Sequence, residues 1–187
     1  MDIIELCSNQ RDALVDRWVN LFFASYPLDS KGFMRTSRDR FANPVGETTR
    51  MAAAVLFDAV TGKEADAETV KTALHDLIWV RAVQDMPPSK AVGALFLLKD
   101  VLRGAILPEC LKPGQSGAKL LDAYLAMESR VDTLGLMALD MYSEARERVF
   151  RIRVEEVKRS QSAVIRLAKL RREQETAPET ENRGVEE

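Results

Sequence analysis

Hydrophobic residues recur three or four positions apart along most of this 187-residue chain, and no stretch alternates apolar and polar residues as a surface strand does. The first such stretch predicts a helix from about residue 2 to residue 26, with one apolar face formed by Leu14, Trp18, Leu21 and Phe22. Further helices are expected over residues 29–40, 43–62, 66–85 and 89–107. The pattern therefore predicts an all-α fold.

Short polar residues, glycine and proline mark the ends of these helices. Asn43 followed by Pro44 is a start signal, because asparagine caps a helix and proline suits its first position. Gly62 is a C-terminal stop and Asp66 caps the next helix. The remaining boundaries are expected at Pro27, at Pro87 and Pro88, and at Pro108.

The last long helical region, residues 118–174, contains no proline and a single glycine, Gly135. It is predicted to form either one very long helix or two helices separated near residues 128–132. The chain then ends in a polar, glutamate-rich tail, residues 175–187, which we expect to be disordered.

Two stretches, residues 91–107 and 134–141, are apolar on nearly every side, which is typical of helices buried on most sides. We therefore expect helices wrapped around central helices, in a globin-like arrangement rather than a simple up-down bundle. Residues 1–143 are assigned to this globin-like domain.

Beyond that domain, residues 144–174 are predicted to extend the last helix as a dimerisation segment. Its apolar positions alternate four and three residues apart, the spacing of a coiled-coil seam. An exposed helix cannot bury such a seam alone, so we expect a homodimer. The heptad seam consists of Phe150, Val154, Val157, Gln161, Val164 and Ala168.

Charge is unevenly distributed although the formal net charge is only −2. Residues 143–172 carry a net charge of +6 and residues 173–187 a net charge of −5. A basic helix that binds nucleic acid or an acidic partner is one alternative. The solvated surface of a coiled coil is favoured, because aromatic residues are absent beyond Phe150 and the acidic tail would compete for the basic face.

Cellular location is predicted from three features. Cys7 and Cys110 stand far apart without metal-ligand spacing, the first residues lack the basic and apolar regions of a signal peptide, and charges interrupt the longest apolar stretch. We expect a cytoplasmic protein with no membrane span.

Arg81 is the side chain with the most unusual predicted environment, because it falls within the apolar stripe formed by Val70, Leu74, Leu77 and Ile78. A buried guanidinium needs a carboxylate, several carbonyls or an anionic ligand. One alternative is an internal bridge to Asp85, Asp39 or Asp140. The other is a small polar pocket or junction near the helix start at Pro88, with residues Arg40, Asn43, Arg81, Gln84, Asp85 and Ser89.

His75 is the only histidine, and its neighbours Lys71, Thr72 and Asp76 predict a solvated face. A haem-binding globin sensor using His75 is kept as an alternative. One histidine cannot supply a di-iron site, and no catalytic triad or phosphate-binding glycine loop is apparent. We expect no enzymatic activity, no cofactor and no metal.

Three blocks of sequence together resemble the N-terminal domain of the RsbRD type (RsbT co-antagonist), the sensory module of stressosome-like signalling proteins. The blocks are Asp39-Arg40-Phe41-Ala42-Asn43-Pro44-Val45-Gly46, then Arg81-Ala82-Val83-Gln84-Asp85 with Pro88-Ser89, then Asp140-x-Tyr142 with Arg146-Glu147. The resemblance covers roughly residues 2 to 160, and the second block is its most specific part.

The resemblance implies a globin-like helical domain that binds no haem, dimerises and senses a signal, for which a small ligand is one candidate. In such proteins the last helix usually leads to an output domain, a STAS domain or a kinase. Here only the acidic tail follows Arg172. We therefore expect the signal to pass to a separate, unidentified protein partner.

Overall fold

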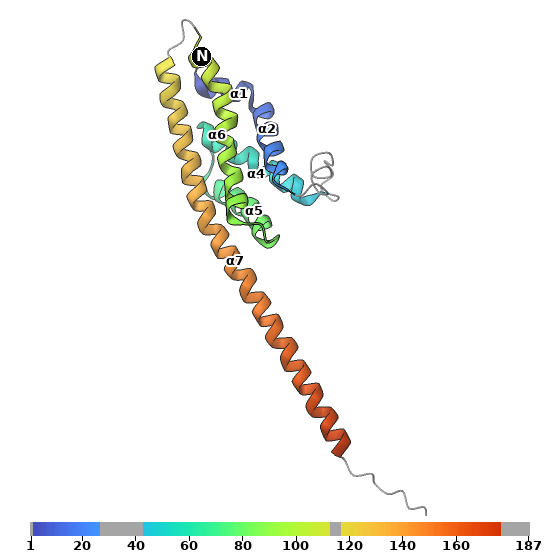
Figure 1. Ribbon diagram of the computed structural model, residues 1–187. Coiled ribbons are helices and arrows are strands. Elements are labelled where there is room, and N and C mark those ends of the chain that lie inside the picture. Colours follow the sequence, from blue (N-terminus) through green and yellow to red (C-terminus); the bar gives the residue numbers. More distant parts are fainter. Residues whose placement is uncertain (1, 27–42, 113–116, 177–187) are drawn as a thin grey trace, which may run out of the picture. The chain divides into compact units, whose positions relative to one another are not determined.

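The computed structural model describes residues 2–26, 43–112 and 117–176, and these residues form six helices and no strand (Figure 1). The chain divides into two units, Met1–Arg146 and Glu147–Glu187. The all-helical class and the long C-terminal helix are confirmed, and a globin-like arrangement stays a prediction. The helices are α1 (Ile3–Asn9), α2 (Arg11–Ala24), α4 (Pro44–Thr61), α5 (Ala67–Val83), α6 (Pro88–Cys110) and α7 (Gly117–Thr176).

The single helix expected over residues 2–26 is wrong, because the chain breaks at Gln10 into α1 and α2. Gln10 leaves helical geometry, with φ −110° and ψ 10°. The residues before it, Ser8 and Asn9, have side chains that compete with the helical backbone for hydrogen bonds and so weaken a helix at that point. The helix expected over residues 29–40 lies outside the described residues.

The predicted caps of α4 and α5 are confirmed. The side chain of Asn43 accepts a hydrogen bond from the amide of Gly46 at 2.9 Å, and Pro44 is the first residue of α4. Gly62 ends α4 with a left-handed φ of 91°. The Asp66 carboxylate accepts from the amide of Thr69 at 3.0 Å.

One boundary near the middle of the chain differs from expectation, and at another the structure decides between the two alternatives that the sequence left open. Pro108 does not end its helix, since α6 continues to Cys110. The proline falls in the last turn, where few residues follow and the loss of one backbone hydrogen bond is tolerated. Residues 117–176 form one helix, so the break near residues 128–132 does not occur.

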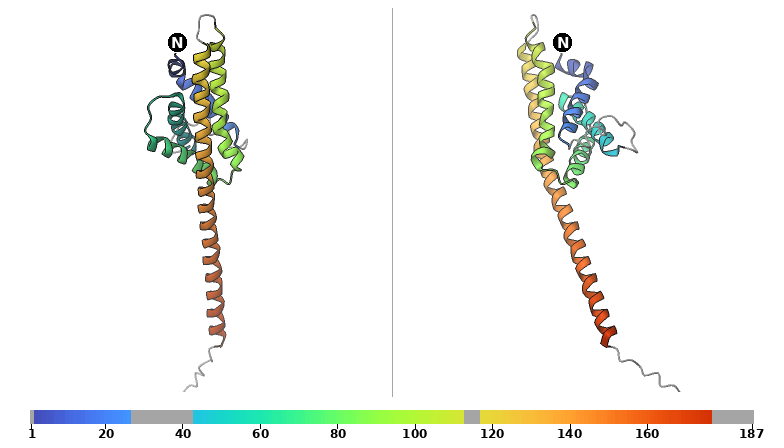
Figure 2. Two further views of the ribbon diagram at one scale, coloured as in Figure 1. Left: turned by 90° about the vertical axis from the view of Figure 1, so that its left-hand side faces the viewer. Right: turned by 45° about the vertical axis from the view of Figure 1, so that its right-hand side comes forward.

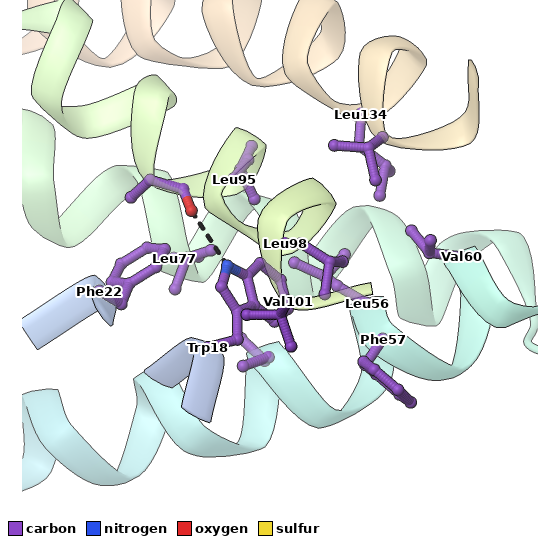
Figure 3. Packing of buried hydrophobic residues seen from close by; sticks show 14 of the residues in the cluster. Trp18, Phe22, Leu56, Phe57, Val60, Leu77, Leu95, Leu98, Val101 and Leu134 are labelled. Carbon is purple, nitrogen blue, oxygen red and sulfur yellow. Dashed lines mark hydrogen bonds between the residues drawn. The ribbon is translucent and has the colours of Figure 1, made fainter. Parts of the chain in front are cut away.

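Helix α6 is central to the hydrophobic core of the first unit, as its composition predicted. Its inward side chains pack against those of α2, α4 and α5, and the Trp18 indole donates a hydrogen bond to the carbonyl of Ala94 at 3.0 Å (Figure 3). That bond satisfies a buried polar group without interrupting the packing. The buried residues of α6 are Ala91, Val92, Ala94, Leu95, Leu98, Val101, Leu102 and Ile106.

The expectation that residues 134–141 are buried on most sides is wrong. Leu134 and Ala138 are buried, but Leu136 is 68% exposed and Leu139 is 44% exposed. In the part of α7 that belongs to the first unit, one face packs against the other helices, and the opposite face exposes apolar side chains to solvent. A helix that is apolar all round is thus only half covered here.

Within the first unit, α7 runs beside α6 in the opposite direction, as all three views show (Figures 1 and 2). Polar contacts join the two helices: Lys99 pairs with Asp132 at 2.7 Å, and Arg103 contacts the Tyr124 hydroxyl at 3.2 Å and Glu128 at 3.3 Å. Gly135 allows close packing, because a Cβ there would lie 2.3 Å from Cζ of Phe96. None of the helices in the described part of the chain is long and apolar enough to cross a membrane.

Candidate functional site

The turn between α5 and α6 is where most of the predicted junction residues lie. Helix α5 ends in a Schellman motif: the amide of Met86 bonds the carbonyl of Arg81, and the amide of Asp85 bonds that of Ala82, both at 3.2 Å. Asp85 occupies the left-handed position, with φ 61°, that such motifs usually give to glycine. Aspartate tolerates this conformation better than most residues, at some cost in backbone energy.

Arg81, four residues before Asp85, is completely buried. Its Nη1 donates to the carbonyl of Lys90 at 2.9 Å, in the first turn of α6. Its Nη2 donates to the carbonyl of Phe22 at 3.3 Å and to the hydroxyl of Ser25 at 3.2 Å. The guanidinium thus joins the end of α2 to the start of α6.

Aromatic rings complete the surroundings of this cation. The guanidinium carbon lies 3.5 Å from the centroid of the Phe22 ring and 5.1 Å from that of Tyr26. Both distances are within the range of cation–π attraction. Of the three kinds of partner that the sequence allowed, the described residues supply carbonyl oxygens, together with a hydroxyl and aromatic faces.

No carboxylate among the described residues pairs with Arg81, and its Nε is buried without a hydrogen-bond partner. Burial lowers the pKa of Arg81 to about 10, and Tyr26 offsets part of that shift. Arg81 therefore remains a cation at neutral pH, held mainly by dipoles and ring faces. The oxygens around it are hydrogen-bond acceptors, which would repel an anion placed among them.

The same turn is held from its other side by α7. The hydroxyl of Tyr142 donates to the carbonyl of Met86 at 2.5 Å. Arg146 pairs with Asp85 at 2.5 Å and donates to the carbonyl of Ala82 at 3.1 Å. Because residues 142 and 146 are one helical turn apart, they project from the same face of α7.

The other predicted junction residues are not gathered around Arg81. Asn43 is buried and caps α4, whereas Gln84 and Ser89 are exposed at the ends of α5 and α6. Asp85 pairs with Arg146 rather than with Arg81. Arg40 and Asp39 lie outside the described residues.

Sequence reasoning missed the roles of Tyr142 and Arg146, although both belong to the third block of the resemblance. The structure shows that the third block contacts Asp85 of the second block and the adjoining residue Met86. Tyr142 and Arg146 are polar residues four positions apart on an otherwise apolar helix face, and this spacing could have indicated a shared contact. Phe22 and Ser25 gave none, because their contacts with Arg81 are long-range.

His75, the alternative haem ligand, is 54% exposed on α5. Its ring stacks on Trp79 with centroids 5.8 Å apart, and its Nδ1 lies 3.5 Å from the Asp76 carboxylate. No group of histidine, cysteine and acidic side chains in the described ranges is arranged to hold a metal ion. Cys7 is buried, and burial raises the pKa of its thiol to about 11, which disfavours the reactive thiolate.

The residues of the heptad seam belong to the second unit. Phe150 is 66% exposed, Val157 and Val164 are similarly exposed, and Val154 is half-buried. Basic side chains share this helix, including Arg153, Lys158 and Arg166, all of them exposed. The apolar positions of this helix are therefore exposed in the single chain.

These observations define a class: an all-helical domain in which polar groups hold the turn before the central helix and the final helix is long. A comparison with family models finds the RsbT co-antagonist protein rsbRD N-terminal domain, matched over residues 12–157. The chain belongs to this family, that of the N-terminal domain of a stress-signalling regulator. No curated protein and no solved structure matches the chain.

Proposed function

We propose that this protein is a non-catalytic, cytoplasmic sensor or adaptor that forms a homodimer, binds no haem and passes a signal through α7 to a separate protein partner. The observation that carries the proposal is the family match, which includes the turn-clamping residues Tyr142 and Arg146 and continues to residue 157 in the second unit. The matched region thus contains both the domain core and the start of the extended helix.

The geometry of the first unit supports a binding or relaying role. Its most elaborate polar arrangement, at the α5–α6 turn, joins four helices, and the residues described there include no nucleophile and base set up for proton transfer. His75 supports a haem-free state, because an exposed histidine stacked on Trp79 lacks the apolar pocket that haem requires.

Self-association is supported by apolar surface on α7. In the second unit the heptad seam is exposed. In the first unit Leu121, Leu125, Leu136 and Leu139 are exposed, and residues 121 and 139 are five whole helical turns apart and so face the same way. Two exposed apolar patches, Leu121 with Leu125 and Leu136 with Leu139, thus lie on one face of the helix, and exposed apolar patches mark interaction surfaces.

The proposal is tested in two steps. The mass of the full chain and of a variant ending at Arg146 is measured in solution by light scattering, and an absorption spectrum is recorded from the same samples. We expect a dimer that weakens on truncation and no Soret band. An unchanged dimer would exclude the heptad seam as the interface, and a Soret band lost in His75→Ala would establish the haem alternative.

The relay is tested by capture from the source cells with the tagged full chain. The matched control is the chain ending at Arg146. We expect one or more proteins to be retained by the full chain and lost with the truncated chain. Equal retention by both would show that α7 beyond residue 146 does not carry the interaction.

A further inference from the structure

Four helices of the first unit meet at the α5–α6 turn. Two sets of contacts hold this turn, one buried and the other exposed to solvent. Arg81 holds the turn from within the core, where water is excluded. On the outer side, Asp85 is 60% exposed and its partner Arg146 is 33% exposed. Only the outer contact is open to solvent, ions and competing charged groups.

The outer contact also holds a strained residue. Asp85 is the only residue other than glycine with a positive φ among the described residues. A non-glycine residue in the left-handed region persists when surrounding contacts over-determine it, and such residues concentrate at switches. Here the surrounding contacts are the ion pair with Arg146 and the two Schellman hydrogen bonds.

The partner of Asp85 is positioned where a change would matter. Arg146 is the last residue of the first unit, and the helix continues without a break into the second. Tyr142, one turn earlier, is 7% exposed, and its hydrogen bond to Met86 is buried. Two contacts therefore hold α7 on this turn. The buried hydrogen bond of Tyr142 is shielded from competing ions and charged groups, whereas the exposed ion pair of Arg146 is not.

We infer that the Asp85–Arg146 pair is a breakable latch, which fixes the turn of α7 around residues 142–146 on the α5–α6 turn. Opening the latch exchanges the ion pair for hydrated charges and removes one of the three contacts that hold Asp85 in its left-handed conformation. A bound ligand or partner favours the open state if it pairs with either charge. The inference rests on the proposed relay through α7 and assigns the contact that regulates it.

The latch is tested by amide hydrogen exchange of the full chain, followed by mass spectrometry of peptides covering residues 138–150. Asp85→Asn removes the charge but keeps a residue that tolerates a left-handed backbone. Arg146→Gln removes the other charge. The matched control is Arg151→Gln, which breaks the exposed pair of Arg151 with Glu147, 3.7 Å apart, one turn further on.

We expect exchange in residues 143–150 to rise roughly three- to fivefold in each single variant, the range for a partly exposed ion pair. The double variant should exchange no faster than Arg146→Gln alone, which loses both the ion pair and the hydrogen bond to the carbonyl of Ala82, and peptides from α6 should be unchanged. Raising the salt concentration should accelerate exchange in the wild-type protein and leave the variants unaffected. The Arg151→Gln control should match wild type in residues 138–146.

Three results would overturn the latch: no change in either variant, additive effects in the double variant, or an equal rise throughout the first unit. The exchange measurement needs no partner, so it is separable from the relay. A normal latch response with no protein lost on truncation at Arg146 would contradict the relay alone. Partner loss on truncation without a latch response would contradict the latch alone.

Discussion

The guanidinium carbon of Arg81 lies 3.5 Å from the centroid of the Phe22 ring, and the same side chain donates to the backbone carbonyl of Phe22 at 3.3 Å. One residue of α2 thus supplies both a ring face and an oxygen to a buried cation of α5. This double contact ties two helices that are 59 residues apart in the chain.

Replacing Arg81 by methionine should lower the free energy of unfolding by about 2–4 kcal/mol, because it leaves the Ser25 hydroxyl and several buried carbonyls without their donor. Arg81→Lys keeps the charge but cannot reach both α2 and α6 while stacking on Phe22, so it should cost nearly as much. Urea unfolding monitored by circular dichroism measures both. A loss below about 0.5 kcal/mol in both variants would show that the guanidinium is not a structural anchor.

The presence of glycine at position 46 has a local cause that the sequence pattern alone did not reveal. A Cβ at Gly46 would lie 2.2 Å from Nδ2 of Asn43, the side chain that caps α4. Gly46→Ala should therefore displace the cap and destabilise the protein by about 1 kcal/mol, the usual value of an N-cap.

The control for Gly46→Ala is the same substitution in the Asn43→Ser background. Serine caps with a smaller side chain, and alanine favours a helix over glycine. The substitution should then be neutral or slightly stabilising, as measured by the midpoint of thermal unfolding. An equal loss in both backgrounds would exclude the clash with Asn43 as its cause.

Local signals in the sequence predicted most of the helix boundaries. Asn43, Gly62 and Asp66 act through residues three or four positions away, so their roles as caps followed from spacing. The burial of Arg81 likewise followed from its place on the apolar stripe of α5. The caps and the burial of Arg81 are properties of a single helix, so they can be predicted without knowing which helices pack beside it.

Long-range contacts could not be predicted in the same way. The sequence offered Asp85 as a partner for Arg81, yet Asp85 turns outward because its left-handed backbone directs it to Arg146. The exposure of Leu136 and Leu139 was also missed, because an apolar helix surface does not reveal whether it faces the core or a partner. Both outcomes depend on how helices distant in sequence pack together.

The ion pair between Arg11 and Asp58 joins α2 to α4, with nitrogen–oxygen distances of 2.6 and 3.0 Å. Burial raises the pKa of Asp58, but the hydrogen bonds and charges of Arg11 and Lys63 outweigh it, and the net pKa is lowered. The folded state then binds fewer protons than the unfolded state between the two pKa values. The stabilisation is present above the ordinary aspartate pKa, about 3.9, and is lost as the pH falls through the folded-state pKa.

Asp58→Asn should thus lower the free energy of unfolding by about 1–2 kcal/mol at pH 7, and the difference from wild type should shrink as the pH falls below about 4. Urea titrations at several pH values measure this. Asp122→Asn, at an exposed position, is the control and should change little. A difference that is independent of pH would show that the charge of Asp58 is not what stabilises the contact.

Raising the salt concentration should strengthen self-association through the heptad seam. This is opposite to its effect on interfaces held by opposite charges, which salt weakens. If Phe150 and Val157 occupy d positions, Arg153 is a g residue and Lys158 is the e residue that it would face in a parallel partner. Like charges at these positions repel, and salt screens the repulsion. Sedimentation of the full chain at low and high salt measures the effect.

Arg153→Glu should reverse that dependence, because a glutamate at residue 153 would attract Lys158 of the second copy and tighten the dimer at low salt. Arg166→Glu is the matched control: it makes the same change of charge at an outer f position of the helix, where no partner residue faces it. We expect Arg153→Glu to tighten association several-fold more than the control, given roughly 0.3–0.5 kcal/mol for each of two symmetric ion pairs and the removal of repulsion. Equal tightening by both variants would mean that only net charge matters, and weaker association of Arg153→Glu would rule out a parallel dimer in this register.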